Sequence, residues 1–128
     1  MKIFRFDADV GQAIDKYNSI NAVIARISHL KQEAWVNCVH LGSGGMLGYH
    51  EASTSQLFLV VQGTGWVRGL ATGRIAVGAG RVVYWEAGEG HESGTEDGMT
   101  AVVIEGARLE PWQFMPEEPA ETWTTFRQ

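Results

Sequence analysis

The sequence contains very little cysteine, and this limits the chemistry that it can support. Cys38 is its only cysteine, so no disulfide can form within one chain and no zinc site with several thiolates is possible. Cys38 lies in an apolar, alternating segment. We therefore expect it to be a buried small hydrophobic side chain rather than a nucleophile.

Long apolar runs and clusters of basic residues are also missing. No run approaches the roughly 18 residues that cross a bilayer, and the first residues lack the apolar stretch of a secretory signal. The expectation is a cytoplasmic protein with no membrane partner. The net charge of -5 argues against a nucleic-acid partner, because phosphates are neutralised by a basic surface.

Helical periodicity is nearly absent. The 16 glycines separate short segments rich in β-branched and aromatic residues, a pattern that predicts strands joined by turns. The expected strands are residues 2–6, 20–30, 34–41, 57–62, 65–70, 81–86 and 99–105. Residues 9–17 are expected to form at most one helical turn. A chain of 128 residues suits one domain, so we predict an all-β sandwich or barrel.

Proline is scarce, and all of it lies near the C-terminus. Pro111, Pro116 and Pro119 divide the tail into extended pieces that cannot be central strands. Four aromatic side chains in the tail still require burial, namely Trp112, Phe114, Trp123 and Phe126. We expect residues 1–110 to form the barrel and residues 111–128 to pack on it or on a partner subunit.

The predicted strand 57–62 is apolar on both of its faces. Leu57 and Leu59 alternate with Phe58 and Val60, so neither side of the strand is polar in the middle. Such a strand fits a barrel wall that is covered by another sheet or subunit. Together with the aromatic tail, this predicts a homodimer.

Two glycine-bounded segments carry polar side chains at regular intervals. The first, residues 44–63, contains His50, Ala52 and Gln56 between two glycines. The second, residues 80–95, contains Glu86 and His91. Their spacing resembles the two motifs of the cupin superfamily, in which the first motif carries two histidines and a glutamate and the second carries a proline and a histidine.

This resemblance implies a double-stranded β-helix whose motif residues converge at one end of the barrel. It also implies positions for metal ligands, which in metal-binding cupins would be residues 50, 52, 56 and 91. Ala52 has no donor atom on its side chain, and Gln56 lacks the negative charge of glutamate. Cupins range from dioxygenases, isomerases and decarboxylases to sugar-binding and storage proteins, so the fold does not determine the function.

The departures from the motif leave several functions open. Two imidazoles and an amide offset the desolvation of a divalent ion poorly, so His50, Gln56 and His91 would hold zinc, nickel, iron or manganese only weakly. We therefore favour a protein that binds a small organic ligand in the barrel mouth. A metal-dependent enzyme, dioxygenase- or isomerase-like and acting on a small oxygenated substrate, is the alternative, and a scaffold without a ligand is a third.

Several further residues are candidates for the pocket. Phe58 is in phase with Gln56 and could line its wall. His40 could supply a further imidazole if its face of strand 34–41 points inward. We expect Glu92 to face away from the pocket and Glu86 to be a solvated carboxylate in a turn. The sequence indicates no catalytic residue beyond this ligand pocket of His50, Gln56, Phe58, His91 and His40.

Overall fold

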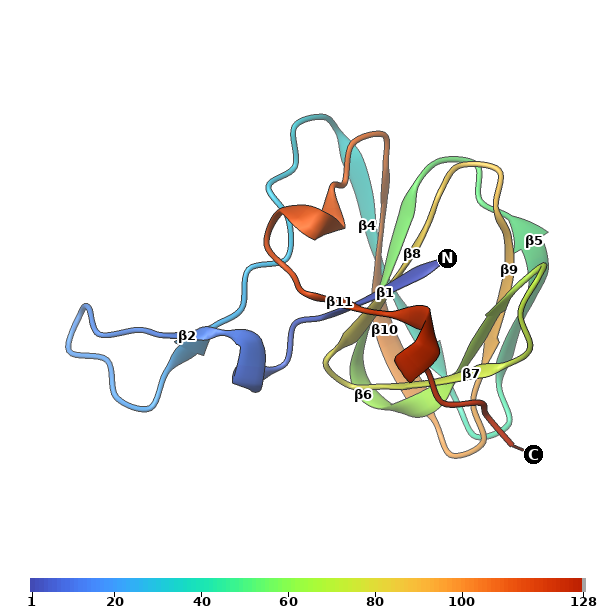
Figure 1. The fold of residues 1–128 in the computed structure, drawn as a ribbon, viewed down its shortest axis with the longest axis horizontal. Coiled ribbons are helices and arrows are strands. Elements are labelled where there is room, and N and C mark those ends of the chain that lie inside the picture. The colour runs from blue at the N-terminus through green and yellow to red at the C-terminus, as the bar shows by residue number, and fades with distance from the viewer. Residues whose placement is uncertain (128) are drawn as a thin grey trace.

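Two antiparallel sheets face each other and are joined by one long strand (Figure 1). The structure is a computed structural model that describes residues 1–127. Its strands are β1 (Lys2–Arg5), β2 (Gln12–Ala13), β3 (Val23–Ile24), β4 (Ala34–Leu41), β5 (Met46–Glu51), β6 (Gln56–Gly69), β7 (Ile75–Gly78), β8 (Arg81–Trp85), β9 (Gly90–Gly94), β10 (Met99–Gly106) and β11 (Glu117–Glu118). Helical structure in this part of the chain is limited to short 3-10 turns, so the all-β prediction is confirmed.

Strand β6 belongs to both sheets. Its first half pairs with β8 and β10 in the sheet ordered β11-β1-β8-β6-β10-β4, and its second half pairs with β7 and β9. The sequence predicted two strands here, separated near Gly63. Gly63 has φ +82°, and a Cβ there would collide with the backbone of Gly98, so only glycine allows the strand to bend from one sheet into the other.

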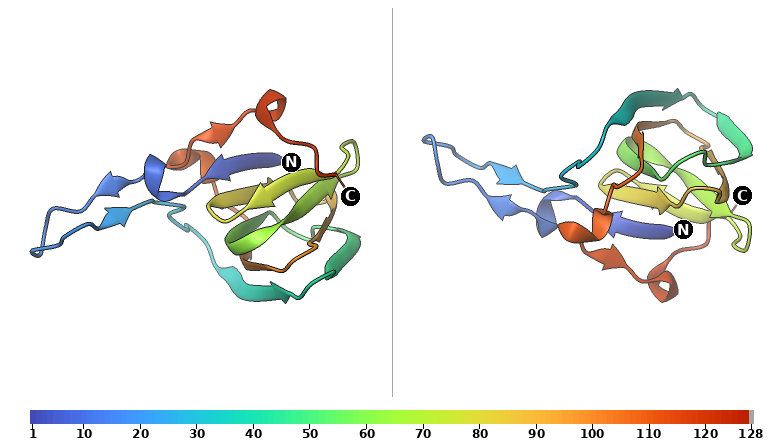
Figure 2. Two further views of the ribbon diagram at one scale, coloured as in Figure 1. Left: turned by 90° about the horizontal axis from the view of Figure 1, so that it is seen from below. Right: turned by 90° about the horizontal axis from the view of Figure 1, so that it is seen from above.

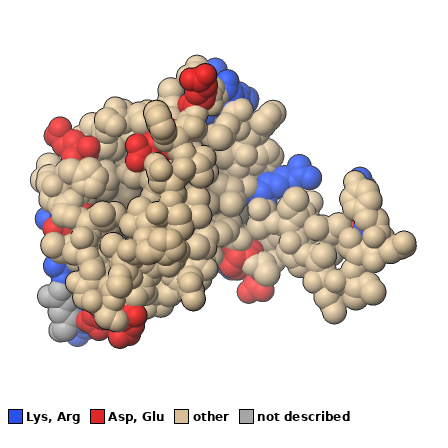
Figure 3. All heavy atoms as spheres, turned by 180° about the vertical axis from the view of Figure 1, so that it is seen from behind, with Lys and Arg blue, Asp and Glu red and all other residues tan. Residues whose placement is uncertain are grey.

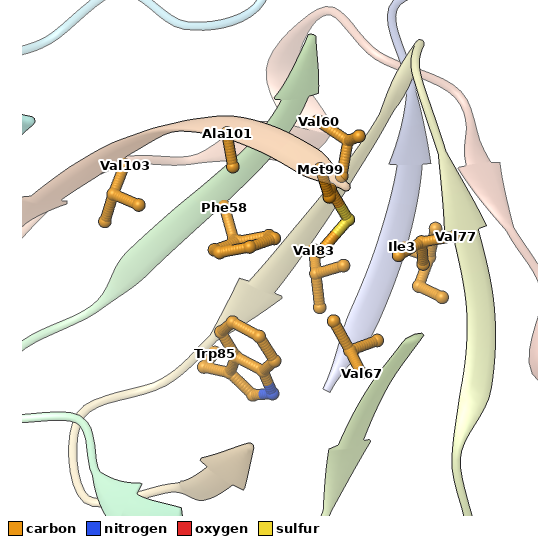
Figure 4. Close-up of a cluster of buried hydrophobic side chains, with 10 residues drawn as sticks. All are labelled: Ile3, Phe58, Val60, Val67, Val77, Val83, Trp85, Met99, Ala101 and Val103. Atoms are coloured by element: carbon orange, nitrogen blue, oxygen red, sulfur yellow. The ribbon is translucent and has the colours of Figure 1, made fainter. Parts of the chain in front are cut away.

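The space between the sheets holds the main hydrophobic core. Phe58, Val83 and Val103 project to the same side from neighbouring strands of the larger sheet, and Val67 faces them from the second half of β6 (Figure 4). Trp85 is completely buried at one end of this cluster. The alternation of apolar residues seen in the sequence thus corresponds to an inner face filled by side chains of several strands.

A second apolar layer covers the outer face of the larger sheet. Leu57, Leu59 and Val82 point outward from it and pack against Leu109 and Met115, which follow β10. The segment after β10 therefore folds back over the barrel, and β11 then pairs with β1 at the sheet edge. This explains why strand 57–62 is apolar on both faces, since one side meets the inner core and the other meets the returning chain.

The strand predicted for residues 20–30 is wrong over most of its length. Only Val23 and Ile24 form a strand, which pairs with Gln12–Ala13 in a separate two-stranded sheet. We call residues 8–26 the arm, because they project away from the barrel (Figure 2). The β-branched residues have strand propensity, but the arm offers them one short partner strand and no covering layer.

Cys38 is also placed differently from the prediction. It lies on the outer face of β4, the edge strand of the larger sheet, and it is exposed. Alternation identified the correct period, but the face that contains Cys38 has no layer over it. Within residues 1–127, no helix is long and apolar enough to cross a bilayer.

The packing of the outer layer predicts a large effect for Leu109. Leu109 is 2% exposed, so Leu109→Ala should lower the free energy of unfolding by about 2–5 kcal/mol through lost burial and the cavity left behind. Leu70 is 81% exposed, and Leu70→Ala is the matched control with an expected change under about 0.5 kcal/mol. Urea denaturation measures both. Equal effects of the two substitutions would contradict the packing of Leu109 in this second apolar layer.

Candidate functional site

A cavity of about 240 Å³ opens between the sheets at one end of the barrel. Its apolar wall consists of Val39, Leu47, Phe58, Trp85 and Val103. Its polar side chains are Asn37, His50, Gln56, His91, Ser93 and Glu105. Four of the five residues that the sequence proposed for a ligand pocket, namely His50, Gln56, Phe58 and His91, therefore border one cavity. We call this cavity the pocket.

The two histidines are cross-strand neighbours. His50 on β5 is in register with His91 on β9, and their ring centroids lie 4.5 Å apart at 60°. A register shift between Leu47 and His50 interrupts the regular ladder just before this pair. The residues from the two motifs are thus brought together by strand pairing, which also fixes the separation of the rings.

Backbone carbonyls orient both imidazoles in the same way. His50 Nδ1 lies 2.7 Å from the carbonyl oxygen of Gly48, and His91 Nδ1 lies 3.0 Å from that of Glu89. A neutral imidazole in such a contact donates its Nδ1–H, which leaves the Nε2 lone pair available. Neither Nε2 has a hydrogen-bond partner on the pocket side within residues 1–127. Both histidines therefore present an acceptor or a base.

The turn before β9 holds His91 in place. The carboxylate of Glu89 accepts a hydrogen bond from the backbone N–H of Glu86 at 2.9 Å and forms an ion pair with the amino group of Met1. The carbonyl of the same residue receives the His91 Nδ1–H. Glu89 thus positions the imidazole through its backbone, while its side chain ties the turn to the start of the chain.

Trp85 forms the floor beneath His91. The two rings are stacked with centroids 4.1 Å apart, and His91 is only 3% exposed. This burial lowers the pKa of His91 below its ordinary value, because the charged imidazolium loses hydration there. The hydrogen bond to the Glu89 carbonyl opposes the shift, and the neighbouring His50 adds to it. His91 is therefore neutral at physiological pH.

The pocket does not fit the four-ligand metal site of the cupin motif. Ala52 is buried and its backbone pairs with Gly88 and Glu89, so the second motif position supplies no donor to the pocket. Gln56 supplies an amide in place of a carboxylate. Across residues 1–127, no three His, Cys, Asp or Glu side chains come close enough to hold one ion. The motif positions themselves therefore supply neither the charge nor the number of ligands of that four-ligand site.

Three polar residues of the pocket were missed by the sequence analysis. Glu105 on β10 is in register with Gln56 on β6, and both side chains lie on the inner face of the sheet. Asn37 lies on the inner face of β4, and Ser93 follows His91 by two residues on β9. Alternation along strand 99–105 could have indicated Glu105, because Ala101 and Val103 precede it at the inward positions.

His40 does not join the pocket. Asn37 and Val39 line it from β4, so His40 projects to the opposite face, where its Nε2 lies 3.5 Å from Cys38 Sγ. The hypothesis that His40 contributes to the pocket required its side chain to lie on the inner face of β4. The side chain lies on the outer face. Glu92 pairs with Arg68 at 2.6 Å and does not border the pocket, as expected, and Glu86 is exposed in its turn.

The comparison with solved structures identifies the fold. A cupin superfamily protein from Desulfitobacterium hafniense is similar with a TM-score of 0.56 and 15% identity, over 69% of this chain and 80% of the other. The chain has the double-stranded β-helix fold of the cupins. No family model and no curated protein matches the sequence.

Two further structures show how varied proteins with this cupin fold are. A conserved protein with a double-stranded β-helix domain from Klebsiella pneumoniae has a TM-score of 0.53 and 13% identity, over 89% of this chain and 96% of the other. The DMSP lyase DddQ from Ruegeria pomeroyi has a TM-score of 0.55 and 15% identity, over 84% of this chain and 57% of the other. At these identities the similarity establishes the fold, and function depends on the site.

The environment of His91 gives a testable titration. Its pKa should lie below 6.5 in the folded protein, so the unfolded chain takes up the proton first as the pH falls. The stability contributed by neutral His91 is therefore complete above about pH 6.5 and is lost on acidification toward the folded-state pKa. Imidazole resonances followed by NMR measure this, with His91→Gln assigning the signal. A midpoint at or above 6.5 would contradict the buried, stacked ring.

Proposed function

We propose that this protein binds a small organic ligand in the pocket, with His50 and His91 as the recognising groups. The observation that carries the proposal is the shared orientation of the two imidazoles, each with Nδ1 on a backbone carbonyl and Nε2 available. Ligand pockets typically combine an apolar wall with a few convergent polar groups. Phe58 and Trp85 supply the wall here, and the histidines supply acceptors beside it.

The size of the pocket limits the ligand. The pocket volume of about 240 Å³ equals that of about eight water molecules, since each occupies about 30 Å³ in the liquid. A drug-sized compound would not fit, whereas a small metabolite-like molecule with one polar end would. Its hydroxyl or N–H group would donate to Nε2 of His50 or His91, and its carbon skeleton would pack on Phe58.

A screen of small fragments tests the proposal. In protein dialysed against chelator, fragments should shift the imidazole resonances of both His50 and His91, since one ligand contacts both rings. His50→Gln should weaken such binding about tenfold, the loss expected for one hydrogen bond to a ring nitrogen. His29→Gln is the control, because His29 is exposed and does not border the pocket.

The alternative function predicts a different result in the same samples. A metal-dependent enzyme would hold one zinc, nickel, iron or manganese ion per chain through dialysis against chelator, and ligand binding would depend on that ion. The available Nε2 atoms are the observation in its favour, because metal-bound histidines commonly donate their other N–H to a carbonyl. Tight metal retention, or the absence of any fragment bound at the histidines, would contradict the proposal of an organic ligand.

We also propose that the protein forms a homodimer in the cytoplasm. Tyr17 and Ile20 of the arm are 90% and 84% exposed, and a two-stranded hairpin of this size is marginal in water by itself. Most of the arm surface visible in Figure 3 belongs to uncharged residues. Val36, 59% exposed on the outer face of β4, is a further apolar position without cover. A second copy would bury these side chains.

Sedimentation equilibrium tests the dimer. At micromolar concentration the wild type should give the dimer mass, and Ile20→Asp should shift the protein toward the monomer because it places a charge in a buried interface. Leu70→Asp is the matched control, since Leu70 is equally exposed but lies on the barrel away from the arm. A monomer mass for the wild type would contradict the proposal.

A further inference from the structure

Among residues 1–127, Glu105 carries the only formal negative charge that borders the pocket. Within residues 1–127 its carboxylate has no ion pair and no hydrogen bond with the protein, and no lysine or arginine lines the pocket. A half-buried carboxylate without a partner is costly, because it has lost part of its hydration and gained nothing in return. Such a group favours a ligand that brings the missing positive charge.

Glu105 also borders a second hollow outside the pocket. This shallow depression, which we call the rim, contains Glu33, Trp35 and Thr54 in addition to Glu105. Trp35 is directly in register with Glu105 across β4 and β10, and it is 74% exposed. An exposed indole beside two carboxylates is a typical arrangement for an organic cation, which is attracted both by the ring face and by the charges.

The interior of the pocket adds a second requirement. His91 is 3% exposed and, within residues 1–127, its Nε2 has no protein partner, so this atom can accept a hydrogen bond from a ligand. The fully buried Nε1–H of Trp85, which also borders the pocket, has no partner there either. His50, which is exposed, offers the same atom beside it. The pocket and the rim share Glu105, so a ligand that spans both meets a carboxylate and an indole in the rim and imidazole lone pairs in the pocket.

From this division we infer that the ligand is a small organic ammonium compound with a hydroxyl or N–H donor at its other end. The ammonium lies at the rim against Glu105 and Trp35, and the donor reaches Nε2 of His50 or His91. The carbon skeleton between them packs on Phe58 and Val103. This inference rests on the proposed ligand-binding function and specifies the class of ligand.

Three probes of one shape test the charge preference. Choline carries an ammonium and a hydroxyl, neohexyl alcohol replaces the nitrogen with carbon, and tert-butylacetate has a carboxylate in place of the hydroxyl end of that alcohol. Binding is followed through the NMR resonances of His50 and His91 in chelator-treated protein. Choline should bind about tenfold more tightly than neohexyl alcohol, the ratio expected for one charge-assisted contact, and tert-butylacetate should bind most weakly.

Glu105→Gln separates the local contact from the general negative charge of the protein. It keeps the shape of the side chain and should abolish the preference for choline over neohexyl alcohol. Glu117→Gln removes the same charge from the exposed strand β11 and should leave the preference intact. Trp35→Leu removes the ring face at the rim and should weaken choline more than neohexyl alcohol, because only the cation is attracted by the ring face.

The outcomes distinguish this inference from the proposed function. If the probes shift both histidines without a preference for choline, or if Glu117→Gln reduces that preference as much as Glu105→Gln, the ammonium inference is wrong and the ligand pocket stands. If neither these probes nor any fragment of the wider screen shifts the histidines, the proposed function fails, and the inference fails with it. A choline preference that disappears in Glu105→Gln supports both.

Discussion

The site depends on strand β6 passing from one sheet into the other. Its first half places Gln56 and Phe58 on the inner face, and its second half pairs with β9, which carries His91. The bend between these halves requires Gly63, whose backbone conformation and close approach to Gly98 exclude a side chain. Because β9 in turn pairs with β5, the position of His50 follows from the same strand. The pocket is therefore formed by hydrogen-bonded sheet rather than by loops.

The chemistry of the pocket follows from which groups are already satisfied. Both Nδ1 atoms are paired with backbone carbonyls, whereas within residues 1–127 both Nε2 atoms, the Glu105 carboxylate and the buried Nε1–H of Trp85 have no protein partner. Burial against Trp85 keeps His91 neutral, so the interior offers lone pairs and the rim offers a negative charge. At the motif positions, Gln56 supplies an amide where the metal site of the motif has an anionic ligand. An organic molecule with hydrogen-bond donors can bind to the same acceptors without burying the charge of a divalent ion.

The sequence predicted the parts of this structure that depend on local pattern. Alternation gave strand 34–41 with its observed bounds, and the two motifs identified His50, Gln56 and His91, which border one pocket. The sequence-based predictions were wrong where a covering layer decides whether a face of a strand is buried. In the part of the chain that the structure describes, no layer covers the face of β4 that carries Cys38 and His40, and residues 20–30 lie mostly in an arm whose only sheet is the short pair β2–β3. Glu105 has no motif around it, and only the register of β10 with β6 brings it to Gln56.

The tautomers of the two histidines test this account most directly. Long-range proton–nitrogen NMR correlations, recorded above neutral pH, report which ring nitrogen of each histidine carries the proton. The account predicts the proton on Nδ1 in both His50 and His91, with Nε2 unprotonated and open to a donor. A proton on Nε2 of either ring would make that histidine a donor toward the pocket. That result would contradict the acceptor-lined site on which the proposed ligand depends.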